Sequence, residues 1–253
     1  MTTSYFNSFQ EKVSEELIPE GLNDPFGSEI SELCKLAAQE LQQLLLLSQD
    51  NLSHNFGFEQ AEHESIRGKM FGVLVVQNSL GEIGYLYTCS GKIDKATSLQ
   101  LVPSPFDIPE NQNHLTKGMN NLTEIKTKIK VIEDSKDPLR QERVDELKLQ
   151  RKELSHHLQN WIFDQYQFLN KNNEAKGLLD IFEQYNGRKP PAGAGECAAP
   201  KLLQHAFQNQ LKPLSIAEFW WGKSNKSLGK IHGEFYPACN NKCRPILSHM
   251  LLP

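Results

Sequence analysis

The sequence lacks the marks of a membrane-spanning or secreted chain. Its apolar runs, such as Leu44 to Leu47, are far shorter than the roughly 20 residues that a transmembrane helix needs. The polar stretch Met1 to Gln10 has no basic segment followed by an apolar one, which a signal peptide requires. We therefore expect a cytoplasmic protein without a membrane partner.

Several common catalytic motifs are also missing. The chain has no Gly-x-Ser-x-Gly elbow and no phosphate-binding glycine loop, since Gly193-Ala194-Gly195 is too short to be a nucleotide fingerprint. Nor does it show the paired carboxylates of a glycosidase. These absences leave cysteine chemistry, metal binding and macromolecular binding as candidates.

The chain has few cysteines, and their number is odd. Five cysteines in a chain with no signal peptide argue against a disulfide framework and for reduced thiols or metal ligands. Cys34 and Cys89 lie in apolar surroundings, as free core cysteines do. The other three, Cys197, Cys239 and Cys243, fall in the C-terminal quarter.

Charge is divided unevenly between the two parts of the chain. Residues 186–253 hold nine Lys or Arg against three Asp or Glu, so the overall charge of -4 conceals a basic C-terminal region. A basic surface with exposed aromatic rings suits nucleic acid. The same charge count is also typical of an ordinary solvated surface.

Apolar periodicity predicts an α+β protein. We expect an amphipathic helix from Ile30 to Leu45 with Ser28 as a cap, and a buried β-hairpin of strands 70–77 and 83–89. Further on, the pattern predicts a helix over 198–207, a strand over 214–221 and a helix within 239–251.

Between these parts the pattern changes to long helices. Apolar residues recur every three or four positions from Leu115 to Phe168, with a break at Asp134 to Pro138. We expect an antiparallel coiled-coil hairpin, although Arg151 and Gln165 interrupt its seam and two ordinary bundle helices remain an alternative. The predicted fold is a small mixed sheet with flanking helices, formed by 26–110 and 186–253, with the helical hairpin inserted over 111–185.

The three C-terminal cysteines are candidate metal ligands. Cys239 and Cys243 form a C-x3-C pair, and Cys197 supplies a third thiolate, a set that suits Zn²⁺. Possible fourth ligands are His205, His232 and His249. The alternative is that these are simple thiols in a reduced protein.

The order of elements resembles the zinc-dependent deaminases of nucleosides and nucleic acids. In that family a ligand opens one helix, a glutamate that transfers protons follows two positions later, and a P-C-x-x-C pair opens the next helix. Here Cys197 takes the ligand position, but Ala199 takes the glutamate position and Glu196 lies on the wrong side of the cysteine. The resemblance therefore implies an inactive or repurposed module, unless a register shift brings Glu196 into use.

Aromatic and basic residues near the end of the strand over 214–221 are candidates for RNA binding. Trp220 and Trp221 can stack on bases, with Lys223 and Lys226 nearby for phosphates. Neighbours on a strand point to opposite faces, so at least one of the two rings is expected in the core.

Several segments resemble the long N-terminal region of bacterial RluA-type pseudouridine synthases. They include Pro190 to Leu203 (PPAGAGECAAPKLL), Ala217 to Gly222 (AEFWWG), Phe235 to Cys239 (FYPAC) and Gly68 to Gln77 (GKMFGVLVVQ). In that family a catalytic domain with a His-Arg-Leu-Asp motif follows, and the motif does not occur in this chain. Whether this chain is itself an enzyme therefore stays open.

The resemblance implies an accessory module that binds or orients RNA. Its partners would be structured RNA, ribosomal or transfer, and a pseudouridine synthase domain attached C-terminally or supplied by another chain. The isomerisation of uridine needs no cofactor. The alternatives are a zinc-dependent or degenerate deaminase acting on a base or nucleoside, and a protein-interaction scaffold that uses the helical hairpin.

Overall fold

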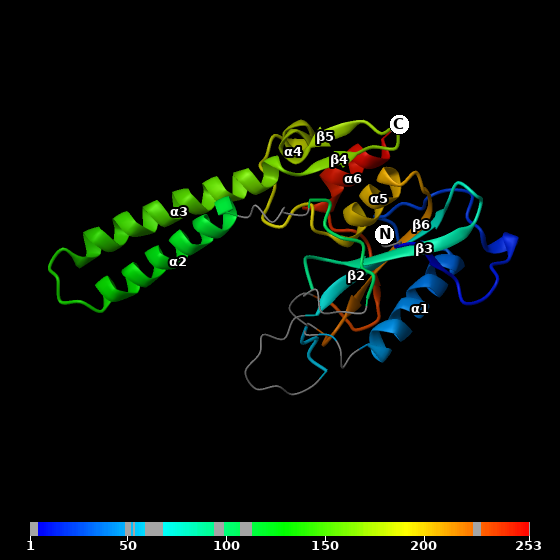
Figure 1. Cartoon of the computed structure of the whole chain (residues 1–253), viewed down its shortest axis with the longest axis horizontal. Coiled ribbons are helices and arrows are strands. Elements are labelled where there is room, and N and C mark those ends of the chain that lie inside the picture. The colour runs from blue at the N-terminus through cyan, green and yellow to red at the C-terminus, as the bar shows by residue number, and fades with distance from the viewer. Residues whose placement is uncertain are drawn as a thin grey trace. The chain divides into compact units, whose positions relative to one another are not determined.

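The structure is a computed structural model that describes residues 5–48, 52, 54–58, 68–93, 99–106, 113–224 and 229–252. The chain divides into two compact units, one of Met1–Pro105 with Gln167–Pro253 and one of Phe106–Tyr166. The elements in chain order are β1 (Asn7–Ser8), the 3-10 helix η1 (Glu15–Leu17), α1 (Glu32–Leu47), β2 (Lys69–Gln77), β3 (Ile83–Cys89), α2 (Asn113–Glu133), α3 (Arg140–Asp164), β4 (Gln167–Leu169), β5 (Ala175–Gly177), α4 (Leu178–Asn186), α5 (Ala198–Gln208), β6 (Lys212–Trp221), β7 (Phe235–Tyr236) and α6 (Cys243–Leu251) (Figure 1).

The expected boundaries of the α+β unit need correction at two places. Phe168, expected at the end of the helical stripe, lies in β4 with its side chain fully buried, so the helical unit ends at Tyr166 and not at 185. At the other end Asn7 in β1 pairs with Tyr85 in β3. The α+β unit therefore begins well before residue 26.

The main sheet has the strand order β1-β3-β2-β6-β7, and each neighbouring pair is antiparallel. The prediction of a mixed sheet is therefore wrong. The chain passes from β3 to β6 by way of α5, and these two strands do run in the same direction. They are not neighbours, however, because β2 lies between them and pairs antiparallel with both.

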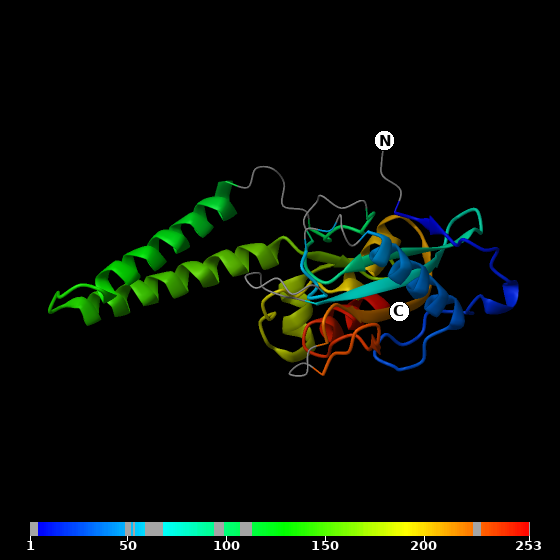
Figure 2. The same ribbon diagram turned by 90° about the horizontal axis from the view of Figure 1, so that it is seen from below.

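The two faces of the sheet carry different helices (Figures 1 and 2). Because side chains alternate along a strand, Phe71 and Phe219 point to the face that packs on α1, where their rings stack with centroids 6.1 Å apart. Gly72, which follows Phe71 on β2, points to the opposite face, toward α5. A Cβ atom at Gly72 would lie 2.8 Å from the Cβ of Ala198. The missing side chain lets the start of α5 lie directly on the sheet.

The α1 helix is fixed to β6 by its N-cap. The cap is Ser31, not the expected Ser28, and its hydroxyl oxygen accepts the N–H of Cys34. The same hydroxyl donates to the Oγ of Ser215 at 2.8 Å. None of the described helices is both long enough and apolar enough to cross a bilayer.

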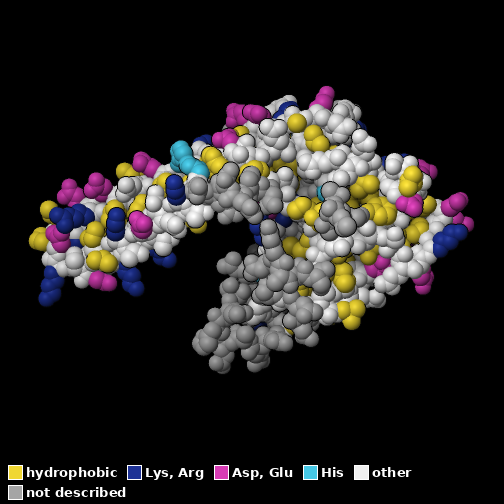
Figure 3. All heavy atoms as spheres, viewed as in Figure 1, with side chains coloured by type: hydrophobic (Ala, Val, Ile, Leu, Met, Phe, Trp, Pro, Cys, Tyr) yellow, Lys and Arg dark blue, Asp and Glu magenta, His cyan; other side chains and the backbone are white. Residues whose placement is uncertain are grey.

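The helical unit consists of α2 and α3 packed against each other. A small apolar cluster of Ile125, Ile129 and Val144 joins the two helices. Gly118 allows close contact, because a Cβ atom there would lie 2.4 Å from the Cδ2 of Leu158. Acidic and basic side chains both lie along the surface of this unit (Figure 3). The predicted helical hairpin is therefore present, whereas coiled-coil packing along its length stays a prediction.

Candidate metal centre

The fold brings the three predicted metal ligands together. Cys197 is the N-cap residue of α5, Cys243 is the first residue of α6, and Cys239 lies in the turn before α6. Their Sγ atoms all lie within 4.8 Å of one another. The sulfurs of Cys239 and Cys243 are 3.5 Å apart.

Tight turns place each cysteine at its helix. Before α5, Gly193 and Gly195 adopt φ values of 74° and 91°, which the left-handed region allows for glycine at little cost, and the chain reverses just ahead of Cys197. Before α6, the N–H of Ala238 donates to the carbonyl of Pro25 at 2.9 Å and anchors the residue that precedes Cys239. The C-x3-C pair thus spans a turn and the start of a helix.

The thiols share protons among themselves. Hydrogen bonds from Cys197 and then Cys243 lower the pKa of Cys239 far below its ordinary value. Correspondingly, the hydrogen bond with Cys239 raises the pKa of Cys197 to about 12, and the bonds with Cys197 and Cys239 raise the pKa of Cys243. One thiolate is therefore favoured within the group at neutral pH, and a thiolate is the form that binds metal.

The sulfur spacing fits a tetrahedral zinc ion. With Zn–S bonds of 2.3 Å, two sulfurs of a tetrahedral site lie about 3.8 Å apart. The observed separations, from 3.5 Å for one pair to a limit of 4.8 Å, bracket that value. Three thiolates leave one coordination position for a further ligand.

The histidines expected as fourth ligands are used elsewhere. The ring of His249 contacts the carbonyl oxygen of Phe168 at 2.9 Å, and the Nδ1 of His232 accepts the N–H of Gly222. His205 packs against the ring of Tyr5. Among the described residues, the group of convergent metal-binding side chains therefore consists of the three cysteines alone.

Cys34 and Cys89 are confirmed as core thiols, with relative exposures of 0% and 2%. Burial raises the pKa of Cys34 to about 12 and also raises that of Cys89. Both thiols are therefore protonated at neutral pH, which separates them chemically from Cys239.

Glu196 is occupied by a different interaction. Its Oε2 lies 3.0 Å from the Nζ of Lys201, a lysine that is only 3% exposed, and its Oε1 accepts a hydrogen bond from Ser104. The lysine also donates to the carbonyls of Cys89 and Gly91. Since Glu196 balances a buried cation, the register shift that would turn it toward the cysteines does not occur.

Sequence reasoning missed the carboxylate of Glu218. It lies on β6 with a relative exposure of 7%, and its Oε1 accepts the N–H of Ala199 at 2.9 Å. Burial raises the pKa of Glu218 to about 7, and the nearby Cys239 adds to the rise, while the Ala199 hydrogen bond and Lys230 oppose it. The available signal was an acidic residue inside the otherwise apolar strand 214–221.

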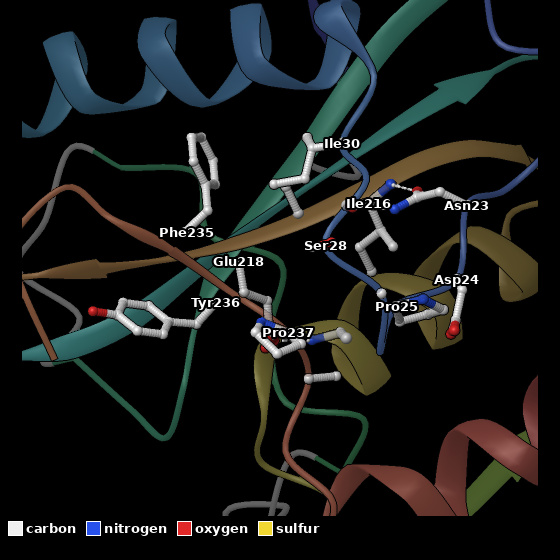
Figure 4. A pocket seen from close by; sticks show the side chains of 14 residues that line it. Asn23, Asp24, Pro25, Ser28, Ile30, Ile216, Glu218, Phe235, Tyr236 and Pro237 are labelled. Carbon is white, nitrogen blue, oxygen red and sulfur yellow. Dashed lines mark hydrogen bonds between the residues drawn. The ribbon is translucent and has the colours of Figure 1, made fainter. Parts of the chain in front are cut away.

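A cavity of about 100 Å³ opens beside this carboxylate (Figure 4). Ala199, Glu218 and Ala238 form part of its wall, and the last of these directly precedes Cys239. Asn23 forms another part, and its side chain is bound to the backbone of Ile216 through two hydrogen bonds of 2.8 and 3.1 Å. The cavity is thus bordered by Ala238, which directly precedes Cys239, and by Ala199, which lies two positions after Cys197.

Two cations lie on aromatic rings near the cavity. The Nζ of Lys230 is 3.5 Å from the centroid of the Tyr236 ring, and the guanidinium of Arg244 is 3.9 Å from that of Phe26. Tyr236 lines the cavity, and Phe26 lies between two residues that line it, Pro25 and Gly27. The wall of the cavity thus carries the rings of Phe235 and Tyr236 and the carboxyl groups of Asp24 and Glu218, and the two cations lie outside the residues that line it.

The structure buries both tryptophans that were expected to bind RNA. Trp220 and Trp221 are 7% and 3% exposed, so neither ring presents a face for stacking on a base. Trp221 packs against the rings of Phe58, Phe219 and His232. The Trp220 ring lies directly on Gly68, where a Cβ atom would be 2.3 Å from its Cζ2. Lys223 is exposed, and Lys226 lies outside the described residues.

Comparison of this chain with protein-family models, with curated proteins and with solved structures gives no match.

Proposed function

We propose that this chain binds one zinc ion through Cys197, Cys239 and Cys243 and uses it for the hydrolytic deamination of a base or nucleoside. The observation that carries the proposal is the convergence of three thiols at the start of α5 and α6, beside a cavity that contains a buried carboxylate. A bound zinc ion with an open position lowers the pKa of a water molecule and so supplies the attacking group.

The order of elements supports the deaminase class over other hydrolases. A helix and a β-hairpin (α1, β2 and β3) come first, and after the intervening elements α2 to α4 the chain forms α5, β6, β7 and α6. The cysteines stand at or just before the starts of α5 and α6. This is the placement by which zinc deaminases hold their metal. Phe235 and Tyr236 line the cavity, and aromatic side chains there suit a planar ring as substrate.

The metal assignment is tested by matched cysteine variants. The protein purified without chelator is expected to contain one zinc per chain by elemental analysis. Cys243→Ala should lose it, because a site with two remaining thiolates binds zinc far more weakly. Cys34→Ala, another buried cysteine removed in the same way, should keep it.

Loading with cobalt gives a second readout for the same variants. A thiolate-to-cobalt charge-transfer band is expected in the wild type and in Cys34→Ala, and its intensity should fall in Cys243→Ala. Protein that is folded by circular dichroism but binds neither metal contradicts the proposal.

A second candidate function is the accessory RNA-binding role. It is favoured by the C-terminal region, where basic side chains are exposed and most acidic ones are buried or paired. Two of the three acidic residues there are turned inward, since Glu196 pairs with Lys201 and Glu218 is buried. The exposed charged residues include Arg188, Lys189, Lys212 and Lys223. The described surface of this region is therefore more basic than its composition, which suits contact with phosphates.

The RNA-binding role is tested by filter binding of ribosomal RNA over a series of salt concentrations. Affinity is expected to fall steeply as salt rises, because counterions are released on binding. The variant Lys189→Glu should bind more weakly, whereas Lys35→Glu on α1, which changes the charge by the same amount, serves as the control. If no RNA is retained at low salt, this candidate fails, and the zinc proposal is unaffected.

A further inference from the structure

The buried position of Glu218 calls for an explanation. Removing a carboxylate from water costs several kcal/mol unless a cation or hydrogen bonds compensate it. None of the described Lys, Arg or His side chains forms an ion pair with Glu218, and the carboxylate accepts a hydrogen bond from the N–H of Ala199 at Oε1. Groups buried at such cost are found preferentially at functional sites.

The sheet register explains how Glu218 reaches the start of α5. Glu218 pairs with Gly72 on β2 and therefore points to the same face of the sheet, the face that packs on α5. Because Gly72 has no side chain, Ala198 can lie against the strand. The N–H of Ala199 is thereby brought to the carboxylate.

The helix position where the deaminase pattern has its glutamate is held here by Ala199, which is 1% exposed. Its N–H is already bound by Glu218, and both residues line the same cavity. The strand thus supplies a carboxylate at the helix position where the deaminase pattern has one.

We propose that Glu218 is the catalytic carboxylate of this centre, presented from β6 in place of the missing helix glutamate. The assignment rests on the proposed deamination. Glu218 takes a proton from the attacking water as the C–O bond forms at the ring carbon and gives it to the adjacent ring nitrogen. It then moves the second water proton to the amino group as the C–N bond breaks. One water is consumed and one ammonia is released, with no oxidant or reductant.

The geometry suits this role because the carboxylate is anchored at one oxygen. Oε1 is held by the Ala199 N–H, and no described residue hydrogen-bonds Oε2. A group that transfers protons must be fixed in place and still keep an oxygen for the reacting atoms. Glu218 meets both conditions on the wall of the cavity.

The test compares Glu218→Gln with Glu40→Gln. Glutamine keeps an oxygen for the Ala199 N–H but cannot transfer protons. Glu40 is a matched control, because it is 8% exposed and accepts a backbone N–H, that of Gln10, on the opposite face of the sheet. Zinc content and ammonia release are measured with cytidine, adenosine and a short single-stranded RNA as probes.

We expect both variants to keep zinc, and Glu218→Gln to lose at least about 100-fold in ammonia release, as loss of a general acid-base does. Glu218→Asp should recover part of the rate, whereas Glu40→Gln should match the wild type. Full activity in Glu218→Gln overturns the assignment. Loss of zinc from Glu218→Gln also overturns it, because Glu218 would then support the metal site and not the proton transfer.

Failure of the deamination proposal gives a different result. If the zinc-containing wild type releases no ammonia from any probe, deamination is contradicted, and the cobalt-loaded proteins then decide the role of Glu218. A carboxylate beside the open position must change how the visible absorption depends on pH. The pH midpoint should therefore shift in Glu218→Gln and not in Glu40→Gln, and an unshifted midpoint overturns the placement of Glu218.

Discussion

At the scale of single residues, Glu218 links the chemistry of the centre to the stability of the fold. Burial raises the pKa of Glu218 from its ordinary value of 4.5 to about 7. The unfolded chain therefore releases this proton at a lower pH than the folded chain does. Between these two values the free energy of unfolding must fall as pH rises, because the folded state binds the extra proton.

This linkage predicts a pH-dependent difference between the metal-free wild type and Glu218→Gln. The full shift corresponds to roughly 3 kcal/mol, lost progressively between pH values of about 4.5 and 7. Glutamine carries no charge, so the variant should be the more stable protein at pH 8 and should lose this advantage at pH 4. Urea unfolding in the presence of a chelator measures the difference, and parallel pH profiles would contradict it.

At the scale of elements, the contact between β2 and α5 positions both halves of the centre. Gly72 and Ala198 bring the helix onto the strand, so that the Ala199 N–H reaches Glu218 and Cys197 is held at the start of α5. Elements with a strong local pattern, such as the 70–77 and 83–89 hairpin, were predictable from sequence. The role of Gly72 was not, because it depends on a helix that comes more than a hundred residues later.

A methyl group at Gly72 should disturb this contact. Its Cβ would lie 2.8 Å from that of Ala198 and 3.1 Å from the Cδ1 of Leu202, so Gly72→Ala should cost about 1–3 kcal/mol of unfolding free energy, as overpacking does. Zinc affinity should fall with it, because α5 carries Cys197. Gly21→Ala is the control, since no atom lies within 4 Å of its added Cβ. Equal stability of the two variants would show that α5 does not depend on this close approach.

At the scale of the whole molecule, the α+β class, the helical hairpin and the three cysteines could be read from local patterns. The antiparallel sheet, the inclusion of β1 and the burial of both tryptophans could not, because each depends on which distant strands become neighbours. The role of Glu218 could not be predicted from the sequence for the same reason. A glutamate in a strand signals a site only once the strand is known to lie between two helices.

The division of the sheet between distant parts of the chain also has a consequence for biosynthesis. Val75 in β2 pairs with Ser215 in β6, so the central strand pair cannot form until the chain through β6 has left the ribosome. The α2–α3 hairpin depends on nearer contacts and can form earlier. During that interval one long edge of the β2–β3 hairpin lacks its partner, and an unpaired edge of this kind is where a nascent chain is most exposed to chaperones and to aggregation.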